Sequence, residues 1–281
     1  MRFVICIVTC LFFLGTNAQN YIPDIEPETI VYKKIDTINL NLHIYKPKNF
    51  DLQNTYNCIV FFHGGGWNSG NYKAFSRQSK YLASRGLIAI SADYRIKNKH
   101  NTTPFDAVED AKSAIRYIRK HAKYLNINPN MIAAGGGSAG GHLASACGNI
   151  EKLDNVDEDL SISSKPNALV LFNPVYDNSK NGFGYKRMEG RYLEISPLHN
   201  ITENAPPTII FFGTKDKTTP VASSKLYKQK MDEVSSRCDL FLYEGQEHSF
   251  FNRGEYFIKA LVETDKFLAS LGYLKGKPTL K

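Results

Sequence analysis

The sequence contains little that would support a disulfide framework or a metal site. Its 281 residues include five cysteines, two of which lie within the first ten positions. The other three, Cys58, Cys147 and Cys238, are far apart. Zinc sites are typically built from closely spaced pairs of ligands, and this spacing offers none. We therefore expect three buried, apolar thiols and no metal site.

Long hydrophobic runs and clusters of like charge are also lacking. The apolar stretch Phe3–Leu14 is well short of the roughly 20 residues that a membrane-spanning helix needs. The formal net charge is +8, but the 35 basic residues are scattered along the chain. Such a balance is typical of a solvated, mildly basic surface. We therefore expect no nucleic-acid partner and no stable insertion into a membrane.

The first 18 residues have the pattern of a secretory signal. Arg2 precedes the apolar stretch, and small residues through Ala18 follow it, at the positions that a signal peptidase reads. We predict that residues 1–18 are removed on export to the periplasm or the cell exterior, and that residues 19–281 form a single domain. Cys10 leaves a lipoprotein as an alternative, which the residue before it and the short apolar stretch disfavour.

Hydrophobic periodicity predicts an α/β fold. Residues 29–45 alternate apolar and polar side chains around a turn, which indicates an antiparallel hairpin at a sheet edge. Beyond it, short apolar runs alternate with helix-length segments, as in a mostly parallel, doubly wound sheet without a large cap domain. The expected strands are Tyr56–Phe62, Leu87–Ala92, Met131–Ala134, Ala168–Phe172, Thr208–Phe212 and Leu240–Tyr243. The expected helices are Phe75–Ser84, Pro104–Tyr124, Gly140–Gly148, Val221–Val234 and Arg253–Leu271.

Two segments interrupt this alternation. Glu151–Pro166 is polar with an acidic middle, and we expect it to form a surface loop. Val175–Asn204 carries several aromatic residues but has no clear period. Such a segment can form a small lid, one wall of a substrate pocket or an ordinary packed excursion, and the sequence leaves these alternatives open.

The motif Gly-Gly-Ser-Ala-Gly at residues 136–140 is the most informative feature of the chain. An apolar strand precedes it and a helix-forming run follows it. In a G-x-S-x-G motif at such a junction, small neighbours let the backbone turn sharply and leave the serine hydroxyl exposed. The N–H groups of the following helix point to where an oxyanion would form. We therefore expect Ser138 to be a nucleophile.

A second glycine-rich turn, residues 63–67, directly follows the first predicted buried strand. Because the carboxyl ends of parallel strands meet at one edge of the sheet, this turn should lie beside Ser138. Its free backbone N–H groups can bind a negatively charged oxygen. We predict an oxyanion hole formed by the N–H groups of Gly65, Gly66 and Ala139.

Two later strand ends supply the acid and the base that an active serine needs. Asp216 follows the strand predicted at 208–212, and His248 follows the strand predicted at 240–243. The order Ser, Asp, His along the chain is that of α/β-hydrolases. We predict that His248 is the general base for Ser138 and that Asp216 orients it.

Four other ionisable residues are weaker candidates. His142 lies four residues beyond the serine on the same helix, so its side chain should point away from the attacking face. His63 is better placed to hold the glycine turn by hydrogen bonds. Asp239 and Glu247 do not follow a strand end as the predicted acid does.

In combination, these motifs resemble the bacterial feruloyl and acetyl-xylan esterase branch, the BD-FAE type, of the hormone-sensitive-lipase-like α/β-hydrolases. The resemblance covers nearly the whole mature chain, from about residue 42 to residue 271, and implies a serine esterase that needs no metal and no organic cofactor. It assigns the same residues to the triad and to the oxyanion hole. The segments that carry it are His63–Trp67, Asp93–Arg95, Asp106–Arg119, Gly136–Ala144, Ser196–Leu198, Pro206–Pro207 and Gly213–Pro220.

Two departures from lipase-like relatives refine this expectation. Those relatives often carry Asp where this chain has Gly137, and the predicted sheet begins too early for their N-terminal helical cap. Without that cap we expect an open cleft, which suits acetyl or feruloyl groups on a plant or algal polysaccharide such as xylan. A small ester is the alternative substrate. Trp67 and Tyr94 are candidates for lining the substrate pocket, but each can equally be a packing residue.

Three other functions remain open. An exopeptidase of the prolyl-oligopeptidase type shares the elbow and the late Asp and His, but usually carries a large propeller for which this chain has no room. An arylformamidase also uses a His-Gly-Gly turn, but the export signal argues against a cytosolic enzyme. A carbohydrate-binding homologue that has lost catalysis is disfavoured because all three triad residue types follow the correct strands.

Overall fold

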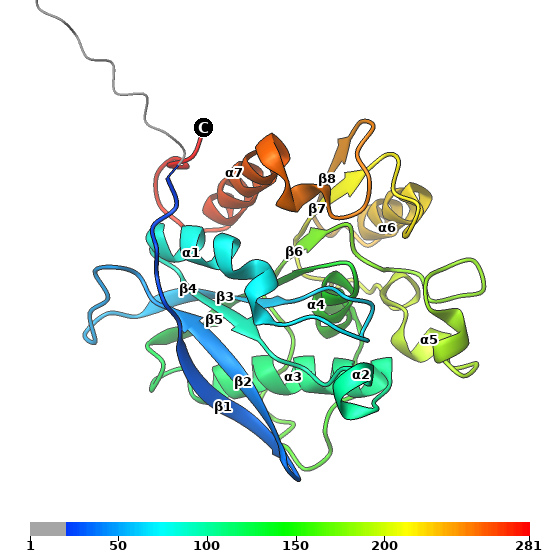
Figure 1. Ribbon diagram of the computed structural model, residues 1–281, viewed down its shortest axis with the longest axis horizontal. Helices are drawn as coiled ribbons and strands as arrows, with labels where there is room; N and C mark the ends of the chain where they lie inside the picture. The colour runs from blue at the N-terminus through cyan, green and yellow to red at the C-terminus, as the bar shows by residue number, and fades with distance from the viewer. Residues whose placement is uncertain (1–20) are drawn as a thin grey trace, which may run out of the picture.

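The computed structural model describes residues 21–281, which form an eight-stranded sheet with helices on both faces (Figure 1). The strand order is β1-β2-β4-β3-β5-β6-β7-β8. β1 and β2 form an antiparallel hairpin, β2 is antiparallel to β4, and the later neighbours are parallel. The predicted fold class is confirmed. The strands are β1 Glu28–Ile35, β2 Ile38–Tyr45, β3 Tyr56–Phe62, β4 Ile88–Ala92, β5 Ile127–Gly137, β6 Ala168–Phe172, β7 Thr208–Gly213 and β8 Cys238–Tyr243.

The helices form a layer on each face of the sheet (Figure 1). α1 and α7 pack on one face, and α3, α4 and α6 pack on the other. The short α2 and α5 lie in the connections that follow β4 and β6. The helices are α1 Ser76–Ser84, α2 Lys97–His100, α3 Pro104–Lys120, α4 Ala139–Asn149, α5 Tyr192–Ile195, α6 Val221–Glu233 and α7 Gly254–Ser270, with 3₁₀ turns at Tyr72–Phe75, Tyr185–Arg187, Pro197–His199 and Phe250–Asn252.

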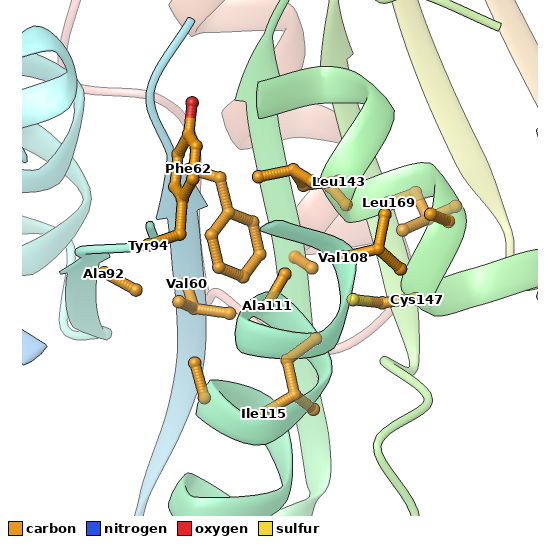
Figure 2. Packing of buried hydrophobic residues seen from close by; sticks show 14 of the residues in the cluster. Val60, Phe62, Ala92, Tyr94, Val108, Ala111, Ile115, Leu143, Cys147 and Leu169 are labelled. Carbon is orange, nitrogen blue, oxygen red and sulfur yellow. The ribbon is translucent and has the colours of Figure 1, made fainter. Parts of the chain in front are cut away.

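Alternation along β3 shows how the sheet divides the core into two layers. Val60 and Phe62 pack with α3 and α4 (Figure 2), whereas Ile59 and Phe61 belong to the layer under α1 and α7. These four side chains are at most 1% exposed. Burying each one stabilises the folded state by about 1.5–3 kcal/mol. The central strands are therefore held from both faces, and their carboxyl ends form a rigid platform.

Among the strand boundaries, the start of β5 differs most from the predicted one, because polar residues enter the strand. β5 starts at Ile127, ahead of the predicted start, and includes the largely exposed residues 128–130. Tyr56 pairs with Ile127 but Cys58 pairs with Ile132, so these polar residues occupy an irregularity in the ladder. Backbone pairing extends the strand here, and the hydrophobic period on which the prediction rested does not reveal it.

The segment Glu151–Pro166 contains no helix or strand, as predicted, and basic residues of α3 hold it in place. Lys112 and Arg116 both form ion pairs with Asp154, and Arg116 also pairs with Glu158 at 2.6 Å. The acidic middle of the loop therefore balances buried positive charge on α3.

The three cysteines in the described part of the chain are free and buried, as predicted. Burial raises the pKa of Cys147 and of Cys238 to about 12. Because the thiolate is the reactive form of cysteine, these side chains serve as packing groups.

The predicted signal segment, residues 1–18, lies outside the described residues. Among residues 21–281, none of the helices combines the length and the apolar character that crossing a bilayer requires.

Candidate active site

Ser138 occupies the sharp turn between β5 and α4. Its φ of 54° and ψ of −120° lie in a region that non-glycine residues rarely adopt. Its backbone N–H donates to the backbone oxygen of Phe172 (3.0 Å). Its backbone oxygen accepts from the N–H groups of His142 (3.0 Å) and Val175 (3.2 Å). These bonds hold the turn, and the half-buried serine lines a cavity of about 530 Å³.

Gly137 before the serine is required by packing. A Cβ atom at this position would lie 2.7 Å from Cζ of Phe251 and 3.4 Å from Cζ of Phe75. Both rings line the same cavity as Ser138. An Asp at this position, as in lipase-like relatives, would require a different arrangement of these rings.

The predicted acid and base are in contact. His248 Nδ1 donates to Oδ2 of Asp216 at 2.7 Å. The carboxylate is fully buried and also accepts hydrogen bonds from the N–H groups of Thr218 (2.8 Å) and Thr219 (2.9 Å). Burial alone would raise the pKa of Asp216, but the hydrogen bonds from His248 and the Thr219 N–H outweigh it and hold the pKa below its ordinary value. The acid is therefore a fixed anion at neutral pH.

The Nε2 atom of His248 is left as an acceptor on the cavity side. Because Nδ1 carries the proton that Asp216 accepts, Nε2 is unprotonated in the neutral ring. The structure brings Ser138 and His248 to the wall of one cavity. Among the hydrogen bonds of residues 21–281, the bond that Nε2 makes is to Nδ2 of Asn173 at 3.4 Å, not to the Ser138 hydroxyl. Catalytic hydrogen bonds are often long or unformed without substrate, so this geometry is compatible with proton transfer.

The glycine turn after β3 lines the same cavity as the base. Gly65 has φ 111°, and a Cβ atom there would lie 2.1 Å from the backbone oxygen of Ser69. Gly65 and Gly66 both line the cavity. Ala139 is the first residue of α4, where helix N–H groups have no partner within the helix. The N–H groups of Gly65, Gly66 and Ala139 are therefore placed to donate to an oxygen bound at Ser138.

The excursion Val175–Asn204 supports the glycine turn and supplies part of the cavity wall. Nη1 of Arg187 donates to the oxygen of Gly66 and to Oδ1 of Asn68 (3.0 Å). Phe183 lines the cavity. The segment that the sequence could not assign therefore forms a wall of the site and holds its glycine turn.

Neither Trp67 nor Tyr94 lines the cavity with Ser138, so their interpretation as substrate-pocket residues is wrong. Trp67 is 1% exposed and packs edge-on against the ring of His142, with ring centroids 4.9 Å apart. Tyr94 is 2% exposed, stacks on His63 and donates its hydroxyl proton to the oxygen of His63 (2.8 Å). Both residues support the glycine turn from within the core.

The weaker candidates for acid and base are all engaged elsewhere or exposed. His142 is buried, and its Nε2 donates to the oxygen of Ile195 (2.9 Å). Burial lowers the pKa of His142 to about 4. Nδ1 of His63 donates to its neighbour's oxygen in the glycine turn (2.7 Å). Asp239 pairs with an arginine at the surface, and Glu247 is exposed.

The sequence reasoning missed Asn173, which directly follows β6 and lines the cavity. Its side chain is fully buried. The rule that site residues follow the carboxyl ends of strands also applies to β6 and would have identified it.

Part of the backbone strain in residues 21–281 lies around this site. Four non-glycine residues here have left-handed φ values: Trp67 (58°), Ser138 (54°), Asn173 (34°) and Ser249 (64°). Each such conformation costs free energy and persists only where the surroundings impose it. Within residues 21–281, no group of three or more His, Cys, Asp or Glu side chains is arranged to hold a metal ion. The chemistry that this arrangement can perform is acyl transfer to the Ser138 hydroxyl.

One solved protein similar to this chain is an esterase. Esterase 2 of Thermogutta terrifontis, phosphonylated by cyclosarin, has 42% sequence identity and a TM-score of 0.86, covering 92% of this chain and 98% of that one. A propionate-bound structure of this esterase has 42% identity and a TM-score of 0.85, covering 90% of this chain and 97% of that one.

Two curated relatives are also ester hydrolases by name. The acetylxylan esterase of Xylanibacter ruminicola is 27% identical over 242 residues, which are 80% of this chain and 46% of that protein. The probable carboxylic ester hydrolase LipM of Mycobacterium tuberculosis is 28% identical over 218 residues, which are 70% of this chain and 50% of that protein. The chain thus spans about half the length of these curated relatives.

The family comparison agrees with the motifs and the site geometry. The BD-FAE family model matches residues 42–231, which is more than half of the chain and includes the glycine turn, the elbow and Asp216. The predicted resemblance is confirmed: this chain belongs to the BD-FAE family of α/β-hydrolase esterases.

Proposed function

We propose that this chain is an exported serine esterase that removes acetyl or feruloyl groups from an acylated, xylan-like polysaccharide. The observation that carries the esterase part is one cavity wall that holds a serine in a strained turn and a histidine oriented by a buried carboxylate. Its membership in a family of esterases supports the reaction type.

The reaction follows from the positions of the named atoms. Nε2 of His248 takes the Ser138 hydroxyl proton as Oγ attacks the ester carbonyl carbon. The negative charge on the carbonyl oxygen is stabilised by the N–H groups of Gly65, Gly66 and Ala139. The protonated imidazole returns its proton to the departing alcohol, which leaves an acyl-serine. Water, deprotonated by the same nitrogen, then attacks the acyl carbon, and release of the acid restores the hydroxyl.

The cavity and the relatives support an acylated sugar as substrate. The amides of Asn68 and Asn252 and the hydroxyl of Thr218 lie on its wall, where they can bind hydroxyl groups, beside the rings of Phe183 and Phe251. One relative is named for acetylxylan, and a neighbouring esterase structure contains propionate. Export would bring the enzyme to such polymers, and the N-terminal pattern supports it.

The test is a paired assay on acetylated xylan and methyl ferulate, with p-nitrophenyl acetate as the reference ester. We expect release of acid from at least one natural substrate, complete loss of turnover in Ser138→Ala, and fluorophosphonate labelling of wild type only. Turnover of the reference ester alone would overturn the polysaccharide assignment. Full activity in Ser138→Ala, or no labelling of the wild type, would overturn the serine mechanism.

Export is tested separately by expressing the full chain in a bacterial host and fractionating the cells. We expect the mature protein outside the cytoplasm, with an N-terminus at residue 19 by mass spectrometry. Unprocessed protein confined to the cytoplasm would overturn this part of the proposal, and a lipid-modified Cys10 would replace it with a lipoprotein.

A further inference from the structure

Asn173 is a buried polar residue beside the base that the mechanism above does not use. It follows β6, and its backbone N–H donates to the oxygen of Phe211 on β7 at 2.7 Å. Its side chain is fully buried and lines the cavity that contains Ser138. Its φ of 34° is left-handed, a conformation that asparagine tolerates better than most residues. The backbone is therefore held so that the amide faces the base.

The two ends of the Asn173 amide are identified by their partners. Oδ1 accepts a hydrogen bond from the N–H of Ser249 at 3.0 Å. A backbone N–H can only donate, so the amide oxygen must be the atom that faces Ser249. The NH₂ group is then the atom that lies 3.4 Å from Nε2 of His248. One side chain thus contacts both the base and the residue that follows it.

The NH₂ group of Asn173 and the carboxylate of Asp216 select the same form of His248. Asp216 accepts the proton on Nδ1, and the NH₂ group can only donate to Nε2. Nε2 must therefore present a lone pair for both contacts to exist. When Nε2 takes the proton from Ser138, two donors face each other and the contact with Asn173 is lost.

We propose that Asn173 is a positioning residue for His248 in the esterase reaction. It holds the imidazole with Nε2 unprotonated in the resting enzyme, and it favours passage of the proton from Nε2 to the departing alcohol. Its amide oxygen also holds the left-handed backbone of Ser249, the residue that directly follows the base. This inference rests on the proposed esterase function.

Few charges face the imidazole besides its partner. Asp216 is in direct contact, and its neighbours Lys215 and Lys217 are exposed on the same loop. On the loop of the base, Glu247 and Arg253 are exposed. The other cavity-lining side chains, from the glycine turn, the elbow and the excursion, are uncharged. A new charge at position 173 should therefore dominate any change in the proton affinity of Nε2.

The deciding variant is Asn173→Asp, which keeps the shape and the acceptor for Ser249 but replaces the NH₂ donor with a carboxylate oxygen. A negative charge in contact with Nε2 stabilises its protonated form. We expect the midpoint of the acid limb of kcat/KM against pH, measured with p-nitrophenyl acetate, to move up by about one pH unit or more. At a pH below the wild-type midpoint, kcat/KM of the variant should therefore be at least about tenfold lower than that of the wild type.

Asn252→Asp is the matched control. Asn252 lines the same cavity, and its Oδ1 accepts from Nε2 of Gln78 at 3.0 Å rather than contacting the base. It adds the same charge to the cavity without touching Nε2, so we expect a clearly smaller shift of the acid limb. If Asn173 only held the Ser249 backbone and did not contact Nε2, the shift in Asn173→Asp would be no larger than in the control. An unshifted limb, or a shift no larger than in the control, would overturn the proposal.

Asn173→Gly covers the case in which the Asp variant does not fold, since glycine adopts the same φ without strain. With both amide contacts removed, we expect kcat to fall about 10–100-fold with KM nearly unchanged. An unchanged kcat would overturn the proposal. A wild-type enzyme that hydrolyses no ester and takes no fluorophosphonate label would instead show that the proposed function itself is wrong.

Discussion

The two sides of the active site are built differently. The nucleophile lies between β5 and α4, in the middle of the sheet, and α4 is buried along its whole length. The base follows β8, the edge strand, in which Cys238 is the only buried residue. Backbone packing therefore fixes Ser138, whereas a few side-chain hydrogen bonds fix His248. Substitutions on the nucleophile side should damage folding and catalysis together, and those on the base side should damage catalysis alone.

The largest effect is expected for Asp216→Asn on the base side. An amide keeps the shape but cannot hold the imidazole in the required tautomer, so we expect kcat to fall about 10⁴-fold. Thermal unfolding should change little, since the loop lies at the sheet edge. Asp239→Asn on β8 is the control, because this carboxylate pairs with Arg237 at the surface, and it should keep full kcat. Near-normal turnover in Asp216→Asn would contradict the assigned acid.

Gly65→Ala tests the nucleophile side of the site, through the glycine turn of the oxyanion hole. The new Cβ would lie 2.1 Å from the Ser69 oxygen at a φ of 111°. We expect a loss of about 1–3 kcal/mol in the free energy of unfolding from backbone strain, and a kcat lower by about 100-fold as the oxyanion N–H groups move. Gly86→Ala separates the two causes: its φ is 104° and a Cβ there meets nothing within 4 Å. It should lose stability but not kcat, and equal losses of kcat in both variants would refute the explanation.

A smaller effect is expected where the excursion meets the glycine turn. Arg187→Met keeps a long side chain beside Trp67 but removes the guanidinium over its ring and the hydrogen bonds to Gly66 and Asn68. We expect kcat to fall about tenfold with a small change in KM, because the oxyanion geometry loosens while the cavity wall remains. Lys186→Met, at the exposed neighbouring position, should behave as wild type. A loss confined to KM would show that Arg187 acts on substrate binding instead.

The smallest effect concerns pH and stability. Because the folded state holds the pKa of Asp216 below its ordinary value of 3.8, ionised Asp216 stabilises the protein above that pH. This contribution is lost as the pH falls through the lowered value. Asn at this position lacks it, so the small difference in Tm that we expect between wild type and Asp216→Asn at about pH 6 should narrow as the pH drops below 3.8. A difference independent of pH would show that the carboxylate does not contribute in this way.

Residues that follow a strand end were predictable from the sequence, whereas contacts between distant segments were not. Ser138, Asp216 and His248 each follow an apolar run, and the structure places each at the carboxyl end of a strand. Asn173 obeys the same rule and was overlooked because no motif surrounds it. Hydrogen bonds that help to hold the glycine turn come from Arg187, in a segment without periodicity.

Side-chain direction was the other limit. The aromatic residue after the glycine turn, Trp67, points into the core because its left-handed backbone turns it inward. The sequence shows the aromatic residue but not its φ. The cavity instead takes its aromatic wall from Phe75, Phe183 and Phe251, which come from three separate parts of the chain. Only the folded sheet brings them together.

The buried thiols have a practical consequence for where the folded protein can work. Cys58, Cys147 and Cys238 are sealed inside the molecule, and burial raises the pKa of each. Within residues 21–281, oxidants and disulfide catalysts therefore find no accessible thiolate in the native state. The domain formed by these residues should keep its activity in both reducing and oxidising surroundings.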